Sequence, residues 1–250
     1  MTRQVFSAMG TVVSLDAEGL DGATLGVIHQ LFVDADRRFS LYRDDSELSR
    51  INAGTTALLD ADTAVQQAYR LATEWRSLTD GAFTPTRPDG ALDLNGVVKA
   101  MTMRDAATAL ELAGCHDWTL VVGGDMIAAG AGPTGTSWTT GIVDPFDRTT
   151  LLCAIELRGS RRAVATSGSA ERGDHIWKAT GPSPFVQVTV VADDIVAADV
   201  LATAIVAGGP SMLDRACDRW DVDVLTIDEA AELRATPGFR NSLAEGLAVG

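Results

Sequence analysis

Apolar residues recur every three or four positions in two segments near the start of the chain, and this spacing predicts two amphipathic helices. The first covers residues 25–39 and follows a short predicted strand at residues 12–15. The second covers residues 61–80 and ends at Gly81, because a glycine after the last apolar position stops a helix. The sequence between them, FSLYRDDSELSRINAG (residues 39–54), has the composition of a loop.

The stretch after Gly81 predicts an irregular segment followed by a third helix. Residues 82–101 contain prolines and show no helical period. Thr102 and Asp105 resemble the two ends of a capping box, with aspartate in the last place. This motif predicts a helix that begins at Thr102 and ends at Gly114.

Short apolar runs separated by turn residues dominate the second half of the chain, and they predict strands. The runs are WTLVVGG, MIAAG, WTTGIVD, LLCAIEL, RAVATSG and VQVTVVA. A helical region covers residues 195–207 and continues in SMLDRACDRW, and a last strand is predicted at DVLTI.

The order of these elements indicates the fold class. Helices dominate the first half and strands the second, which favours an α+β fold with mostly antiparallel sheets flanked by helices over a doubly wound parallel sheet. No repeat or linker divides the sequence. We therefore expect residues 1–250 to form a single domain with two lobes.

Composition narrows the possible partners. The chain is 46% hydrophobic, and its 20 basic and 34 acidic residues give a formal net charge of −14. This charge argues against nucleic acid and anionic membranes as partners, but not against a small phosphorylated ligand held by backbone amides and a metal ion. The three cysteines are far apart and no segment has the length of an apolar membrane span, so we expect a cytoplasmic protein.

Two glycine-containing segments are candidates for binding a ligand through the backbone. Gly123, Gly124 and Asp125 follow a predicted strand, where they form either an ordinary hairpin turn or a close approach to a ligand. Residues 165–169, ATSGS, offer hydroxyl side chains and exposed amides that suit a phosphate, or else they form a plain connection between strands. His175, seven residues after Gly168, is either a base or a structural histidine.

Three further side chains have two interpretations each. Asp199 and Thr203 are four residues apart on one predicted helix face, where they provide hard oxygen ligands for Mg²⁺. Alternatively, Asp199 favours the helix dipole and Thr203 bonds back to the carbonyl of residue 199. Lys99 stands in the apolar run VVKAM, where it either neutralises a pyrophosphate or extends to the surface.

Eight motifs, taken together and in order, resemble those of the ApbE family, the FAD:protein FMN transferases. They are MGT (residues 9–11), YRDDSELSRIN (42–52), GAFTPT (81–86), DLNGVVKA (93–100), GGD (123–125), WTTGIVDP (138–145), VATSGSAER (164–172) and AADVLATA (197–204).

The resemblance implies an FAD cleft between two lobes and assigns roles to residues of these motifs. Met9 and Tyr42 would sandwich the isoalloxazine ring, which suits a thioether and an aromatic face. Lys99 and His175 would be catalytic, with His175 as the base. The metal ligands for Mg²⁺ would be Asp199, Thr203 and the carbonyl of Val98. The remaining nucleotide-binding residues would be Thr11, Asp93, Gly124, Asp125, Thr166, Ser167 and Gly168, together with Lys99.

The implied reaction is Mg²⁺-dependent transfer of FMN from FAD to a Ser or Thr hydroxyl of an acceptor flavoprotein, with release of AMP. Three positions depart from the family pattern: Ala100 replaces a second glycine, Ala170 replaces a tyrosine, and HIWKATG (175–181) is shortened. These departures keep two alternatives open, an FAD pyrophosphatase that uses water and a flavin-binding protein without catalysis.

Overall fold

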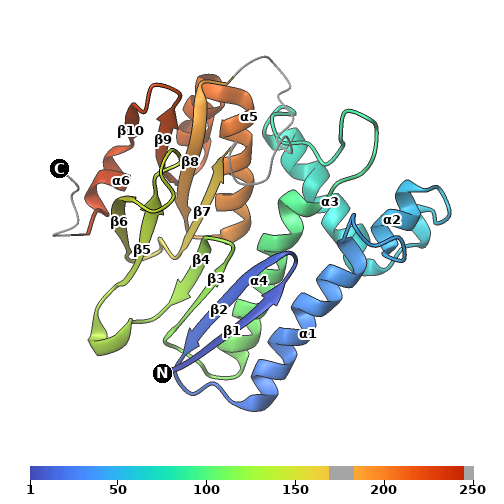
Figure 1. The fold of residues 1–250 in the computed structure, drawn as a ribbon, viewed down its shortest axis with the longest axis horizontal. Helices are drawn as coiled ribbons and strands as arrows, with labels where there is room; N and C mark the ends of the chain where they lie inside the picture. The colour runs from blue at the N-terminus through green and yellow to red at the C-terminus, as the bar shows by residue number, and fades with distance from the viewer. Residues whose placement is uncertain (169–182, 245–250) are drawn as a thin grey trace.

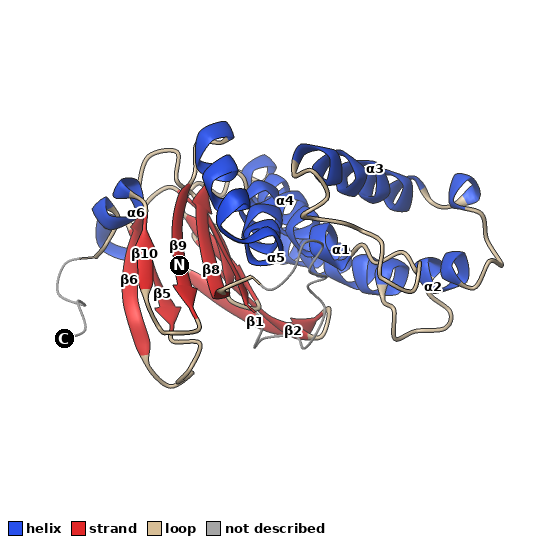
Figure 2. Cartoon of the chain, turned by 90° about the horizontal axis from the view of Figure 1, so that it is seen from above, coloured by secondary structure: helices blue, strands red, loops and turns tan. Residues whose placement is uncertain are grey.

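Helices and strands separate into layers in the computed structural model, which describes residues 1–168 and 183–244 (Figure 1). A large antiparallel sheet forms the middle layer. Long helices cover one of its faces, and a two-stranded hairpin with a short helix covers part of the other (Figure 2). This arrangement confirms the predicted α+β class with antiparallel sheets.

The large sheet has eight strands in the order β1-β2-β3-β4-β7-β8-β9-β10, and each pair of neighbours is antiparallel. Strands β5 and β6 pair with each other in the separate hairpin. The strands are β1 (Thr2–Ala8), β2 (Thr11–Ala17), β3 (Trp118–Val122), β4 (Asp125–Ala129), β5 (Trp138–Val143), β6 (Leu151–Leu157), β7 (Ala163–Gly168), β8 (Phe185–Ala192), β9 (Asp223–Asp228) and β10 (Leu233–Ala235).

The helices pack on one another and on the sheet. Helix α5 lies on β7 and β8, α4 packs against α5, and α1 and α3 pack against α4. The helices are α1 (Gly22–Phe39), α2 (Glu47–Asn52), α3 (Thr63–Leu78), α4 (Asn95–Leu112), α5 (Ile195–Arg219) and α6 (Pro237–Asn241), with short 3₁₀ turns at Leu58–Asp60 and Pro133–Gly135.

Alternation along the strands gives each face of the sheet its own apolar core. In β4, Ile127 joins the larger core under the helices, whereas Met126 and Ala128 face the β5–β6 hairpin. The smaller core also includes Trp138 of the hairpin and Phe239 of α6, both buried. The period of two in a β-strand thus places the hairpin and the helices on opposite faces.

Helix α4 differs from the sequence prediction. It begins at Asn95, not at Thr102, so residues 95–101, the end of the segment expected to be irregular, form its first two turns. The Thr102 hydroxyl donates to the carbonyl oxygen of Val98 at 2.8 Å, a bond made inside the helix and not at its N-terminus. Because α4 is packed against three other helices, most of its faces are apolar and no clear period marks where it begins.

Four other short elements were not predicted from the sequence: β1, α2, β10 and α6. Helix α2 has six residues inside the segment that we read as a loop, and Ser46 caps it by accepting a hydrogen bond from the Ser49 N–H at 3.0 Å. Each of these elements is too short, or too mixed in polarity, for its pattern to stand out.

Helix α5 is the one helix in the described part of the chain that is long and apolar enough to cross a membrane by composition alone. Of its apolar window, 72% is buried inside the structure. Its hydropathy is accounted for by its place between the sheet and α4. The helix is kinked at Gly209, which has φ 65° and ψ −153° and precedes Pro210.

Candidate functional site

A cleft of about 720 Å³ opens where the ends of several elements meet. The β1–β2 turn, the end of α1, the segment 82–96, the beginning of α4, the end of β7 and the first half of α5 all contribute to its lining. Predicted residues that line it are Met9, Thr11, Tyr42, Asp93, Lys99, Thr166, Ser167, Gly168, Asp199 and Thr203.

Two tight hairpin turns lie next to each other at the edge of this cleft. Met9 and Gly10 join β1 to β2, and Gly123 and Gly124 join β3 to β4; all four residues have positive φ. Two-residue turns of this kind match the twist of the flanking strands. A Cβ on Gly123 would lie 2.8 Å from the Thr11 hydroxyl oxygen, so glycine is what lets the two turns approach.

Met9 adopts this conformation without being a glycine. Its φ is 51°, in the left-handed region where a side chain costs roughly 1–2 kcal/mol. The thioether lines the cleft, as does Tyr42, whose side chain is 89% exposed. An apolar sulfur and a largely uncovered aromatic ring therefore flank open space.

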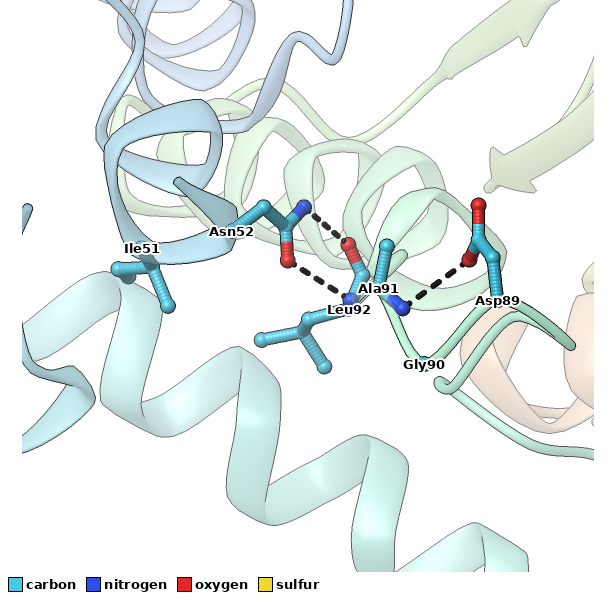
Figure 3. A pocket seen from close by; sticks show the side chains of 6 residues that line it. All are labelled: Ile51, Asn52, Asp89, Gly90, Ala91 and Leu92. Carbon is cyan, nitrogen blue, oxygen red and sulfur yellow. Dashed lines mark hydrogen bonds between the residues drawn. The ribbon is translucent and has the colours of Figure 1, made fainter. Parts of the chain in front are cut away.

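The loop before α4 is held by hydrogen bonds between side chains and the backbone. The Asn52 side-chain amide donates to the Leu92 carbonyl at 2.9 Å and accepts from the Leu92 N–H at 2.8 Å, as Figure 3 shows. The Asp93 carboxylate then accepts from the Asn95 N–H at 2.9 Å where the helix begins. A second hollow of about 520 Å³ lies beside Asn52, and Asn52 and Leu92 are part of its lining. The side-chain amide of Asn52 is already hydrogen-bonded to Leu92, so it stabilises the loop.

Phe83 packs against the first turn of α4. The ring is 4% exposed and lines the cleft, and a Cβ on Gly96 would lie 2.7 Å from its Cε2 atom. Glycine at this position lets the aromatic ring lie directly on the helix backbone. Arg87, from the same loop, also lines the cleft and pairs with Asp89 at 3.2 Å.

Three buried charged side chains form the inner wall of the cleft and its backing. Lys99 of α4, Asp125 of β4 and Asp199 of α5 are 8%, 1% and 5% exposed. The Lys99 ammonium forms an ion pair with Asp125 Oδ2, and its Nζ lies 3.5 Å from Asp199 Oδ2. Two carboxylates therefore lie close to one ammonium in a place from which water is largely excluded.

Hydroxyl groups continue the wall beside Asp199. The Ser167 and Thr203 hydroxyl oxygens lie 2.9 Å apart and share a hydrogen bond between β7 and α5. The Thr166 N–H donates to Asp125 Oδ1 at 3.1 Å, which joins the end of β7 to the buried charges. Asp199, Thr203 and Ser167 thus bring carboxylate and hydroxyl oxygens to the cleft lining.

The sequence matches the model of the ApbE family over residues 9–89 and 86–226, which is most of its length. The chain belongs to the ApbE family. No curated protein sequence matches it.

Solved structures share the fold. Flavin transferase ApbE from Vibrio cholerae is 22% identical, with a TM-score of 0.82 over 97% of this chain and 99% of that one. The ApbE protein from Thermotoga maritima is 20% identical, with a TM-score of 0.81 over 98% and 99% of the two chains. Flavinyl transferase ApbE from Pseudomonas stutzeri, in its apo form, is 17% identical, with a TM-score of 0.75 over 97% and 98%.

Four residues assigned from the ApbE resemblance are not part of the described cleft lining. Gly124 is exposed at the tip of the β3–β4 hairpin, where its neighbour Gly123 lines the cleft instead. Asp125 lies behind the lining and contacts it through Lys99 and Thr166. The side chain of Val98 is buried in α4, and His175 lies outside the described residues.

The structure adds Arg148, which sequence reasoning missed. It lines the cleft from the turn between β5 and β6. The preceding Asp147 fixes this turn: Oδ1 accepts from the Thr149 N–H and hydroxyl, and Oδ2 accepts from the Thr150 hydroxyl. These hydrogen bonds lower the pKa of Asp147, and the bonds from Thr149 have the largest effect. The sequence signal was the turn-forming run DPFDRTT that begins within the WTTGIVDP motif.

The donor atoms in this wall fit a hard divalent cation. Mg²⁺ favours oxygen ligands, and Asp199, Thr203 and Ser167 present a carboxylate and two hydroxyls in the cleft lining. In residues 1–168 and 183–244, no three His, Cys, Asp or Glu side chains gather to hold a metal, so hydroxyl or carbonyl oxygens would have to complete the set. The Val98 carbonyl already accepts the Thr102 hydroxyl.

Proposed function

We propose that this ApbE protein transfers FMN from FAD to a Ser or Thr hydroxyl of an acceptor flavoprotein, with Mg²⁺, and releases AMP. The observation that carries the proposal is the cleft itself. Its lining includes Met9 and Tyr42 together with Asp199, Thr203 and Ser167, which bear carboxylate and hydroxyl oxygens. A flat ring system and a charged phosphate group need surroundings of these two kinds in one site.

Met9 and Tyr42 would hold the isoalloxazine ring. The Met9 sulfur is polarizable and the Tyr42 ring is aromatic, so both suit stacking on a flat conjugated ring. Because Tyr42 is 89% exposed, its face is accessible to a ligand that enters the cleft. The positive φ of Met9 costs energy, as is common for residues that a binding site holds in place.

The oxygen-bearing side chains of the cleft would lie beside the pyrophosphate. Asp199 and Thr203, with Ser167, would hold Mg²⁺, which when bound neutralises phosphate charge and stabilises the leaving AMP. Arg148 lines the same cleft and supplies a cation from the β5–β6 turn. The short Ser167–Gly168 end of β7 offers polar groups that would orient a phosphate.

The proposed transfer is a substitution at the phosphorus of the FMN half of FAD. The acceptor hydroxyl oxygen forms a new bond to this phosphorus, and the bond from phosphorus to the oxygen bridging to AMP breaks. AMP leaves with that oxygen. We propose His175 as the base that takes the acceptor's proton, and Lys99 as a group that helps to position the phosphates.

We also propose a cytoplasmic location. All three cysteines, Cys115, Cys153 and Cys217, are free thiols, and free thiols are typical of proteins in a reducing compartment.

The test is incubation with FAD and Mg²⁺, with and without a flavoprotein domain that carries a surface Ser or Thr acceptor. AMP that appears only with the acceptor, together with FMN bound covalently to that domain, supports the transferase. AMP and free FMN without an acceptor would identify a pyrophosphatase. FAD binding without AMP in either case would identify a flavin-binding protein without catalysis.

A further inference from the structure

Asp125 is almost fully buried, and each of its two carboxylate oxygens contacts a group of the protein. The side chain is 1% exposed and belongs to the first residue of β4. Oδ1 accepts from the Thr166 N–H at 3.1 Å, and Oδ2 pairs with the Lys99 ammonium. This acid is therefore engaged by groups of the protein itself, behind the part of the cleft wall that the structure describes.

Lys99 is shared unevenly between two acids. Its ammonium is in direct contact with Asp125, whereas 3.5 Å separates its Nζ from Asp199 Oδ2. Asp199 lines the cleft next to Thr203, and Asp125 does not. The acid that faces the cleft is thus the one that the ammonium neutralises less.

This asymmetry bears on how a divalent cation would compete with Lys99. An ammonium held against Asp199 would occupy carboxylate oxygens and would repel a second cation at short range. An ammonium held against Asp125 competes less for the Asp199 carboxylate oxygens. The position of Lys99 therefore affects the affinity of Asp199 for a metal.

We infer that Asp125 is a positioning residue that acts through Lys99: it draws the ammonium closer to itself than to Asp199 and so lowers the competition of the ammonium with a divalent cation for Asp199. This inference rests on the proposed role of Asp199 in holding Mg²⁺. It gives the aspartate of the GGD motif a function other than contact with the nucleotide.

The variant Asp125→Asn tests this directly. Asparagine keeps the size of the side chain and an oxygen acceptor for the Thr166 N–H, but it removes the charge that holds Lys99. Of the two carboxylates that Lys99 contacts here, Asp199 then keeps its charge and Asp125 does not. We expect affinity for Mn²⁺, measured on the whole protein without flavin, to fall about tenfold.

A double variant separates this role from direct ligation. Adding Lys99→Met to Asp125→Asn removes the competing ammonium, so Mn²⁺ affinity should return to that of the unaltered protein or exceed it. If Asp125 were itself a ligand, the double variant would bind Mn²⁺ as weakly as the single one, and the inference would be wrong. Glu156→Gln on β6 removes the same charge outside the described cleft lining and should leave the affinity unchanged.

Two further results bear on the inference. The Lys99→Met variant alone should bind Mn²⁺ more tightly than the unaltered protein. This variant provides a test if Asp125→Asn does not fold. Unchanged or weaker Mn²⁺ binding by Lys99→Met would contradict the inference. Absence of Mn²⁺ binding by the unaltered protein also overturns it. Because these measurements contain no flavin, a failure to transfer FMN would count against the proposed function and leave the metal-binding result unaffected.

Discussion

The hydroxyl oxygens of Ser167 and Thr203 lie 2.9 Å apart and connect the end of β7 to α5 inside the cleft. Strand β7 and helix α5 are also packed on each other along their lengths. The bond therefore fixes the relative position of two polar groups that belong to segments far apart in sequence. Its position beside Asp199 makes it part of the proposed metal-binding wall.

Thr203→Val removes one hydroxyl of this pair and keeps the shape of the side chain. We expect the rate of FMN transfer or FAD cleavage to fall at least about tenfold, which corresponds to roughly 1.4 kcal/mol of lost transition-state stabilisation. Thermal stability should change by no more than about 1 kcal/mol, because one ordinary hydrogen bond is lost and Ser167 lines an open cleft.

The matched control is Thr119→Val, the same substitution on β3. Thr119 is 6% exposed and lies outside the described cleft lining, so its replacement should leave the rate unchanged. A Thr203→Val enzyme with the unaltered rate would remove this hydroxyl from the proposed site.

Tyr42→Ala should weaken FAD binding without loss of stability. The ring is 89% exposed, so little packing is lost in the free protein. Loss of a stacking partner should cost roughly 1–2 kcal/mol of binding free energy. Titration by flavin fluorescence measures this, with Leu59→Ala as the control because Leu59 is 87% exposed and lies outside the described lining. Equal FAD affinity for both variants would exclude Tyr42 from the flavin site.

The sequence predicted local elements well where their pattern was strong. Both amphipathic helices of the first half formed close to the expected residues, as did all eight predicted strands. Thr102 was misread as a helix start because its hydroxyl bonds to Val98 inside a helix that is buried on most sides. A capping motif shows a local preference, and packing decided here that the helix continues upstream to Asn95.

The candidate site was predictable in its members but not in their pairing. Most of the residues that motif resemblance selected line the cleft. It did not show that Lys99 is shared by Asp125 and Asp199, because these residues lie far apart in sequence and meet only through the packing of α4, β4 and α5. Arg148 was missed since its turn carries no periodic signal and reaches the cleft only through the position of the β5–β6 hairpin.

Gly209→Ala should destabilise the fold by about 1–3 kcal/mol. The backbone there has φ 65° and ψ −153°, a region essentially limited to glycine. Gly26→Ala provides the opposite case, because Gly26 is exposed inside α1 and an added Cβ would meet nothing within 4 Å. It should stabilise by roughly 0.5–1 kcal/mol. Thermal melting of both variants measures the difference, and an equal effect of the two would contradict the role assigned to the α5 kink.

Asp199 lies near the beginning of α5, where two roles make different predictions. The helix cap is provided by Asp194, whose Oδ1 accepts from the Ala197 N–H at 2.9 Å. Asp194→Asn should therefore cost about 0.3–1 kcal/mol of stability by weakening the interaction with the helix dipole, and should leave catalysis unchanged. This variant is the control for a purely structural effect at the same helix end.

Asp199→Asn should instead reduce FMN transfer by orders of magnitude while the fold is preserved. The substitution keeps the size of the side chain but removes the charge that would hold the cation, which supplies several kcal/mol of charge stabilisation. The remaining Lys99 and Asp125 form a balanced ion pair, so the melting temperature should stay the same or rise. The measurement is the rate against Mg²⁺ concentration for both proteins, together with a melting curve. A rate near that of the unaltered protein at the same Mg²⁺ concentration would show that Asp199 does not hold the metal, and its burial beside Lys99 would then be a matter of packing alone.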